Sequence, residues 1–199
     1  MSRYLLASVL ATACAAVLVI RPTDAAPATT FTVDHMATQA STNQDWCKDA
    51  SSYNDRDETA CEIRGLKESA QRSLDAEVGN GSMTVTGSSR TDVLVQARIM
   101  ARASSMADAR GLAKQVTVTL EGGRLRATGP DAGRERSWWV SYRAQVPASY
   151  DLMLQASNGA VTVTGVRGNI EAETANGSLK LTDLGGRVRA RTNNGSAHV

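Results

Sequence analysis

The sequence predicts an all-β fold, a β-solenoid built from 18-residue rungs in its C-terminal third. Asn-Gly recurs at Asn158-Gly159, Asn176-Gly177 and Asn194-Gly195, and the spacing is 18 residues both times. Between these turns, aliphatic residues alternate with polar ones at the period of two that is typical of strands. A constant period of this length is the mark of a repeat architecture, in which each unit buries its apolar face against the next.

The alignment of the repeat units distinguishes stacked rungs from an antiparallel meander. Residues 158–175 and 176–193 are identical at six of 18 positions and exchange one aliphatic residue for another at four more. The alignment places Glu171 over Arg189 and Glu173 over Arg191. Opposite charges at the repeat distance suit parallel rungs about 4.8 Å apart. A meander would instead use Asn-Gly in two-residue hairpin turns. We therefore expect a stack.

The Asn-Gly turn also occurs earlier, at Asn80-Gly81. The segment 80–87 (NGSMTVTG) matches 158–165 (NGAVTVTG) at six of eight positions. The separation of 78 residues is not a multiple of 18, so we expect irregular N-terminal coils. Asn and Gly both tolerate left-handed backbone conformations, and stacked Asn side chains can form hydrogen-bonded ladders.

The remaining elements follow from local patterns. Alternating segments predict strands at 74–78, 83–86, 93–99, 116–120, 125–128 and 138–146, the last of which Pro147 ends. One segment breaks the pattern and predicts a short helix near 104–115. Ser104 or Ser105 would cap this helix, Asp108 would lie in its first turn, and Met106, Ala109, Leu112 and Ala113 would share a face.

The N-terminal region has the features of an export signal. Arg3 precedes an apolar run from Leu5 to Ile20, which is too short for an ordinary membrane span. We expect a signal peptide over residues 1–25, cleaved after Ala25 or after Ala28. The alternatives are an uncleaved anchor and a lipoprotein modified at Cys14. After cleavage we expect no transmembrane span.

Two cysteines are expected to link the two parts of the exported chain. Cys47 and Cys61 remain after cleavage and predict a disulfide that closes a 15-residue loop, worth about 3 kcal/mol. The disulfide would tie an irregular segment, 26–60, to a solenoid domain, 61–199. The third rung stops at Val199, so we expect a chain truncated at its C-terminus.

Candidate functional residues are few. The formal net charge of +2 gives no reason to expect nucleic acid. We expect no catalytic residues, no metal site and no cofactor, because the Asp, Glu, His and Cys residues match no catalytic or metal-binding spacing. Trp138 and Trp139 are adjacent in an alternating strand, so one faces inward. The other, Trp139, is a candidate binding surface for a sugar or a partner, or packs under another segment.

Several motifs resemble those of the bacterial putative-adhesin family of β-strand-repeat domains. They are the repeated N-G-x-V-x-V-x-G, the strand end at Val146-Pro147, and Trp46-Cys47 followed by Cys61-Glu62-Ile63-Arg64. The resemblance covers about residues 47–199. It implies an exported, right-handed β-helix-like domain and brings no catalytic residues.

The predicted function is non-enzymatic binding or scaffolding at the bacterial cell envelope, as in an adhesin. The partner would be an envelope protein or a glycan, met in the periplasm or at the cell surface. Two alternatives remain open. One is a periplasmic regulatory or envelope-stress partner protein, and the other is a carbohydrate-active enzyme of the β-helix type.

Overall fold

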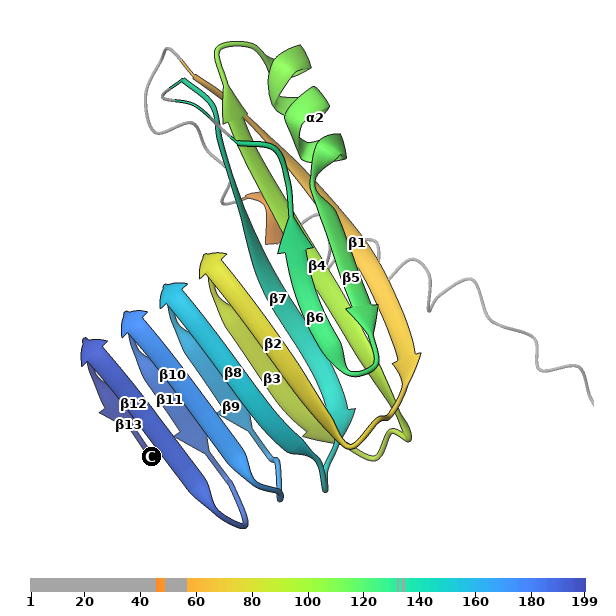
Figure 1. Cartoon of the computed structure of the whole chain (residues 1–199), viewed down its shortest axis with the longest axis vertical. Coiled ribbons are helices and arrows are strands. Elements are labelled where there is room, and N and C mark those ends of the chain that lie inside the picture. Colours follow the sequence, from red (N-terminus) through yellow and green to blue (C-terminus); the bar gives the residue numbers. More distant parts are fainter. Residues whose placement is uncertain (1–45, 49–56, 132, 134) are drawn as a thin grey trace, which may run out of the picture.

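The protein is described here by a computed structural model, which covers residues 46–48, 57–131, 133 and 135–199. The chain folds into two mixed β-sheets, with helix α2 (Met106–Gln115) at one end (Figure 1). The first sheet contains, in spatial order, β1 (Glu58–Ser69), β4 (Asp92–Ala103), β7 (Ser137–Pro147), β3 (Met83–Ser88), β9 (Val161–Thr164), β11 (Leu179–Thr182) and β13 (Ala197–His198). The second contains β12 (Val188–Asn194), β10 (Ile170–Asn176), β8 (Asp151–Asn158), β2 (Ser73–Asn80), β6 (Arg124–Thr128) and β5 (Thr117–Glu121).

The 18-residue spacing sets the register of the C-terminal strands. β10 pairs in parallel with β12 on one side and with β8 on the other, and each residue lies opposite the residue 18 positions away. β11 pairs with β9 and β13 in the same way in the first sheet. Each unit therefore gives one strand to each sheet, and the parallel pairing predicted from the repeat is confirmed.

An earlier coil extends this stack. β2 pairs in parallel with β8, with Asn80 opposite Asn158, and β3 pairs with β9, with Met83 opposite Val161. The similarity between 80–87 and 158–165 thus has a structural cause, because the two segments are neighbours. Residues 89–150 are an insertion between them in sequence.

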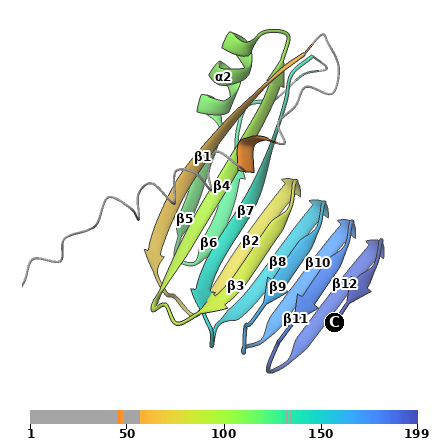
Figure 2. The same cartoon turned by 180° about the vertical axis from the view of Figure 1, so that it is seen from behind.

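The insertion gives the molecule its mixed sheets. β7 pairs in parallel with β3, and β6 with β2, so the insertion covers one end of the stack. β4 then pairs antiparallel with β7 and with β1, and β5 antiparallel with β6 (Figure 2). The described chain is mostly β-structure, as predicted, but the sheets are mixed and do not close, so the structure does not identify a solenoid.

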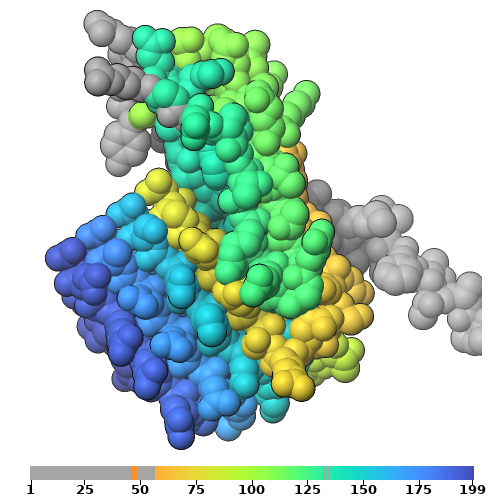
Figure 3. All heavy atoms as spheres, viewed as in Figure 1, coloured from red at the N-terminus to blue at the C-terminus, as the bar shows by residue number. Residues whose placement is uncertain are grey.

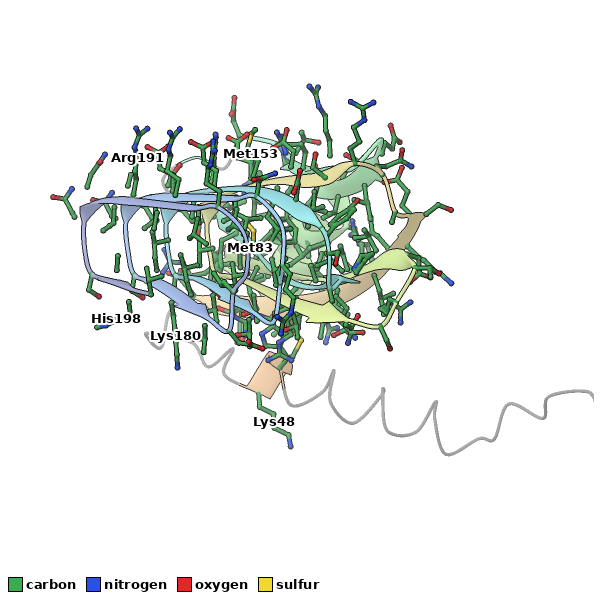
Figure 4. All side chains as sticks on the ribbon, turned by 90° about the horizontal axis from the view of Figure 1, so that it is seen from below. Lys48, Met83, Met153, Lys180, Arg191 and His198 are labelled. Atoms are coloured by element: carbon green, nitrogen blue, oxygen red, sulfur yellow. A yellow bond between two sulfur atoms is a disulfide. The ribbon has the colours of Figure 1, made fainter. Side chains whose placement is uncertain are left out.

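The core lies between the two sheets. Alternation sends small aliphatic side chains inward from both sheets, and residues such as Leu154, Val163 and Leu179 are fully buried. Figure 4 shows Met83 between the sheets, Met153 and Arg191 on one outer face, and Lys180 and His198 on the other. Each buried Val or Leu contributes about 1.5–3 kcal/mol.

The predicted helix is present as α2. Ser105 is its N-cap and accepts a hydrogen bond from the backbone N–H of Asp108 at 3.1 Å. Ala109, Leu112 and Ala113 are buried, as the sequence predicts. Arg64 of β1 donates to the carbonyl oxygens of Ala113 and Val116, so a cation neutralises the C-terminal end of the helix.

The disulfide joins the N-terminal segment to the first sheet. Cys47 and Cys61 are bonded, as predicted, and β1 begins at Glu58, before the second cysteine. The Trp46 ring lies 5.1 Å from the Arg98 guanidinium carbon and 3.9 Å from that of Arg143, on the outer face of the first sheet. The predicted signal peptide and both cleavage points lie outside the described residues.

Candidate functional site

A pocket opens where two strands of the second sheet separate. β2 and β6 pair only at Asp75 with Arg124 and at Ala76 with Leu125. Figure 1 shows β6 turning away from β2 beyond these pairs, with β7 of the first sheet behind the gap. A pocket of about 460 Å³ occupies this place. It is lined by Glu77, Val78, Gly79, Asn80, Arg126, Ala127, Thr128, Trp138, Trp139, Val140 and Tyr142.

Arg126 ends the pairing of β2 with β6. Its guanidinium donates to the backbone carbonyl of Asp75 at 2.8 Å and to both carboxylate oxygens of Asp75 at 2.9 Å. The same group lies 3.4 Å from the Glu77 carboxylate. Because the contact with Asp75 is bidentate, it fixes where the pocket begins.

Tyr142 contributes a buried phenol to the pocket. The residue is 1% exposed, and its hydroxyl is among the buried polar atoms that have no hydrogen-bond partner within the described residues. Burial raises the pKa of the Tyr142 phenol well above its ordinary range, while the Arg126 charge lowers it and the Glu77 charge raises it. The hydroxyl therefore stays protonated at neutral pH and can donate a hydrogen bond.

Two tryptophans form part of the pocket wall. The Trp138 indole N–H donates to the Pro130 carbonyl at 2.9 Å, and its ring lies so close to Gly129 that a Cβ there would be 2.8 Å away. Trp138 also packs against the main core. Trp139 is half-buried and lines the same pocket. The sequence pointed to this dipeptide but missed Tyr142, which alternation alone marks as an ordinary core residue.

The asparagines of the repeat turns form a ladder that ends at the pocket. Asn194 donates to Asn176, Asn176 to Asn158 and Asn158 to Asn80, at 2.9, 2.9 and 2.8 Å. Asn80 is the last acceptor, so its own amide N–H groups lie at the pocket end. Because each amide donates in the same direction, their polarisation adds along the ladder.

The glycines after these asparagines, rather than the asparagines, adopt positive φ. Gly81, Gly159 and Gly195 have φ of +140°, +146° and +157°, whereas the one non-glycine residue with positive φ in the described part of the chain is Asp183. The tolerance of Asn for left-handed conformations is therefore not used in these turns. The ladder and the close stacking of the glycines explain Asn-Gly here.

A shallower hollow lies beside the pocket on the outer face of the second sheet, the face toward the viewer in Figure 3. It has a volume of about 210 Å³ and is lined by Glu77, Gln155, Ala156, Ser157, Glu173 and Ala175. Glu77 lines both hollows, so they are neighbours. We call the second one the shelf.

The Glu and Arg cluster predicted from the repeat is also on this face. Glu171 pairs with Arg189 at 3.7 Å, and Glu173 lies opposite Arg191 in the ladder. Exposed pairs of this kind contribute little, at most about 1 kcal/mol. They support the register and do not by themselves form a site.

The described residues contain neither a cluster of metal-ligating side chains nor a helix that could span a membrane. No three His, Cys, Asp or Glu side chains gather there as a metal ion would require. Within the same residues, no helix has the length and apolar character needed to cross a membrane.

Comparisons with known proteins gave weak likenesses. No family model matches the chain, and no curated protein matches it. Two solved structures are similar to it. One is described as a putative cell adhesion protein from Clostridium sporogenes, with 8% identity, a TM-score of 0.35, and coverage of 66% of this chain and 68% of the other. The second is described as a putative adhesin from Parabacteroides distasonis, with 9% identity, a TM-score of 0.32, and coverage of 68% and 67%. Scores this low do not establish a shared fold or function.

Proposed function

We propose that this chain is an exported, non-catalytic domain that binds a partner at the bacterial cell envelope, in the manner of an adhesin. The observation that carries the proposal is the β2–β6 pocket. It is concave, has a volume typical of ligand sites, and combines apolar walls with a few converging polar groups. Tyr142 provides one of these groups, a buried hydroxyl that has no hydrogen-bond partner among the described residues.

Two further observations support export and a rigid binding platform. The Cys47–Cys61 disulfide suits an oxidising compartment outside the cytoplasm. The coils 73–88, 151–164, 170–182 and 188–198 stack through parallel pairs in both sheets. This stacking supports a local β-solenoid, which would hold the pocket walls in a fixed arrangement.

The proposal is tested by sedimentation of the mature chain with washed bacterial envelope fragments. We expect the wild type to sediment with the fragments and Trp139→Ala to lose at least about fivefold in affinity, since it removes part of the pocket wall. Met153→Ala is the matched control. Met153 is an exposed apolar residue on the same face, outside the pocket, and its change should leave binding intact.

Four results would contradict parts of the proposal. Failure of the wild type to sediment would contradict the binding function. An equal loss of affinity in both variants would contradict the assignment of the binding site to the pocket. Release of cut glycan during incubation would show an enzyme instead. Recovery of one protein in stoichiometric amount would favour the regulatory alternative over adhesion.

A further inference from the structure

We propose that the β2–β6 pocket binds the end of a neutral glycan, with the terminal ring in the pocket and the next ring on the shelf beside Glu77. This inference rests on the proposed function, because it names the ligand class of the same site. Four properties of the pocket support it. They are the unsatisfied Tyr142 hydroxyl, the opposite charges of Arg126 and Glu77, the amide donor of Asn80 at the end of the asparagine ladder, and the aromatic residues of the walls.

The unsatisfied hydroxyl of Tyr142 favours a ligand that can form a hydrogen bond with it. Buried polar groups in native proteins nearly always have a hydrogen-bond partner, so the unpartnered phenol of Tyr142 is exceptional. Tyr142 is among the residues that line the pocket, but its hydroxyl is itself buried, so a bound molecule has to displace part of the wall to reach it. A hydroxyl group on the ligand would accept from the phenol or donate to it.

The charges of the pocket favour a neutral ligand. Arg126 and Glu77 both line it, so an anion would approach the Glu77 carboxylate and a cation would approach the Arg126 guanidinium. The Arg126 charge is already neutralised by the two contacts with Asp75 and by Glu77 at 3.4 Å. A neutral molecule with many hydroxyls can use both groups, because each hydroxyl donates and accepts.

The ladder end adds a donor. Asn80 accepts from Asn158 through its side-chain oxygen, which leaves its amide N–H groups at the pocket. Together with the Tyr142 hydroxyl and the Glu77 carboxylate, the pocket offers donors and acceptors from two strands, β2 and β7. This arrangement can fix the orientation of a ring that carries hydroxyls on several sides.

The walls supply the apolar contact that a sugar ring needs. Aromatic residues make up 4% of the chain, yet Trp138, Trp139 and Tyr142 all line this pocket. The Trp138 and Tyr142 side chains, which lie on the inner side of β7, combine an apolar surface with a polar end, which suits the C–H face and the hydroxyls of a pyranose. Val78 and Val140 extend the apolar lining.

The shelf explains why a chain end, rather than a free monosaccharide, is proposed. It adjoins the pocket through Glu77 and offers the amide of Gln155, the hydroxyl of Ser157 and the carboxylate of Glu173. These groups are polar and lie on an open face, so they can contact a second ring while the rest of the glycan leaves the surface.

The test uses the mature chain and a set of soluble neutral trisaccharides, namely those of N-acetylglucosamine, glucose, mannose and galactose, with binding followed by calorimetry. We expect at least one trisaccharide to bind, and Tyr142→Phe to weaken that binding by at least about fivefold because it removes the hydroxyl alone. Tyr150→Phe is the matched control. The Tyr150 hydroxyl is outside the pocket and accepts from the Gln71 backbone N–H at 2.9 Å, so its loss should leave sugar affinity unchanged.

The outcomes separate this inference from the proposed function. Sedimentation with envelopes combined with no trisaccharide binding at millimolar concentration would overturn the glycan ligand and leave envelope binding in place. Equal affinity in the wild type and Tyr142→Phe would overturn the site. Binding of an extended peptide between β2 and β6 in place of sugar would overturn the ligand class. Trisaccharide binding without envelope sedimentation would uphold the inference and contradict the proposed function.

Discussion

The glycines of the stacked turns are required because there is no room for a Cβ, as well as because of their backbone conformation. A Cβ on Gly159 would lie 1.8 Å from the Gly81 carbonyl oxygen, and one on Gly177 would lie 2.0 Å from that of Gly159. Both contacts are with backbone, which cannot move without disturbing the neighbouring coil. Gly159, Gly177 and Gly195 are therefore each required by the neighbouring coil, and Gly81 is required by Val140 of β7.

This requirement gives a first prediction. Gly159→Ala should lower the free energy of unfolding by roughly 2–4 kcal/mol, because it adds a backbone clash at a position with positive φ. Gly65→Ala is the control, since a Cβ there meets nothing within 4 Å. It should be neutral or stabilise by less than about 1 kcal/mol. Urea unfolding measures both, and equal effects would contradict the stacking.

Tyr142 gives a second prediction, on pH. Its pKa in the folded state is raised above the ordinary value of 10.0 by burial, so the unfolded chain loses this proton first as pH rises. Below pH 10 the Tyr142 proton is bound in both states, so it does not change the free energy of unfolding with pH. Above pH 10 the free energy of unfolding falls, by at most about 1.4 kcal/mol per pH unit for one such group. Tyr142→Phe should reduce the slope of stability against pH between about pH 10 and pH 11. Urea unfolding across this range tests the assignment, and an unchanged slope in the variant would refute it.

At the scale of elements, the asparagine ladder connects four coils. Each inner asparagine both donates and accepts, as Asn176 does with Asn158 and Asn194 at 2.9 Å. The ladder is exposed, so each bond contributes modestly, but the bonds repeat along the stack. Its direction also determines that a donor, rather than an acceptor, lies at the pocket end.

The ladder gives a third prediction. Asn176→Asp keeps the shape, removes the donor and places a carboxylate against the Asn158 oxygen, so stability should fall by about 1–2 kcal/mol at neutral pH. Asn193→Asp makes the same chemical change at an exposed neighbour outside the ladder and should cost less than about 0.5 kcal/mol. Thermal unfolding of the two variants provides the comparison. A larger loss in Asn193→Asp would rule out the ladder as a stabilising element.

The strands and the helix could be predicted from local sequence, because alternation and capping are local properties. The register of β8, β10 and β12 could also be predicted, since an exact repeat fixes which residues stack. The pocket could not be predicted from the sequence. It depends on Arg126 reaching Asp75 from a strand 51 residues away and on β6 leaving β2 after two pairs, and no local pattern encodes either contact.

For the whole molecule, the decisive feature is the insertion of residues 89–150 into the stack. The sequence showed only that 78 residues separate the first Asn-Gly from the second. It could not show that the coil 73–88 lies directly on the coil 151–164, because the intervening chain is long enough to form separate coils of its own. The insertion instead forms β7 and β6, which make two walls of the pocket.

Binding of a glycan in this pocket can be followed with reporters that the chain itself provides. It has three tryptophans. Trp138 and Trp139 line the pocket, whereas the Trp46 ring lies against the Arg98 and Arg143 guanidinium groups of the first sheet. The chain labelled with 5-fluorotryptophan should therefore give separate fluorine resonances for the pocket and for a site outside it.

The most direct test is the fluorine NMR spectrum of this labelled chain during addition of solubilised envelope glycan. Single Trp→Phe variants assign the three resonances. The account predicts that the Trp138 and Trp139 resonances shift with saturation while the Trp46 resonance stays in place. A spectrum that does not change, or one in which only the Trp46 resonance moves, would contradict the account.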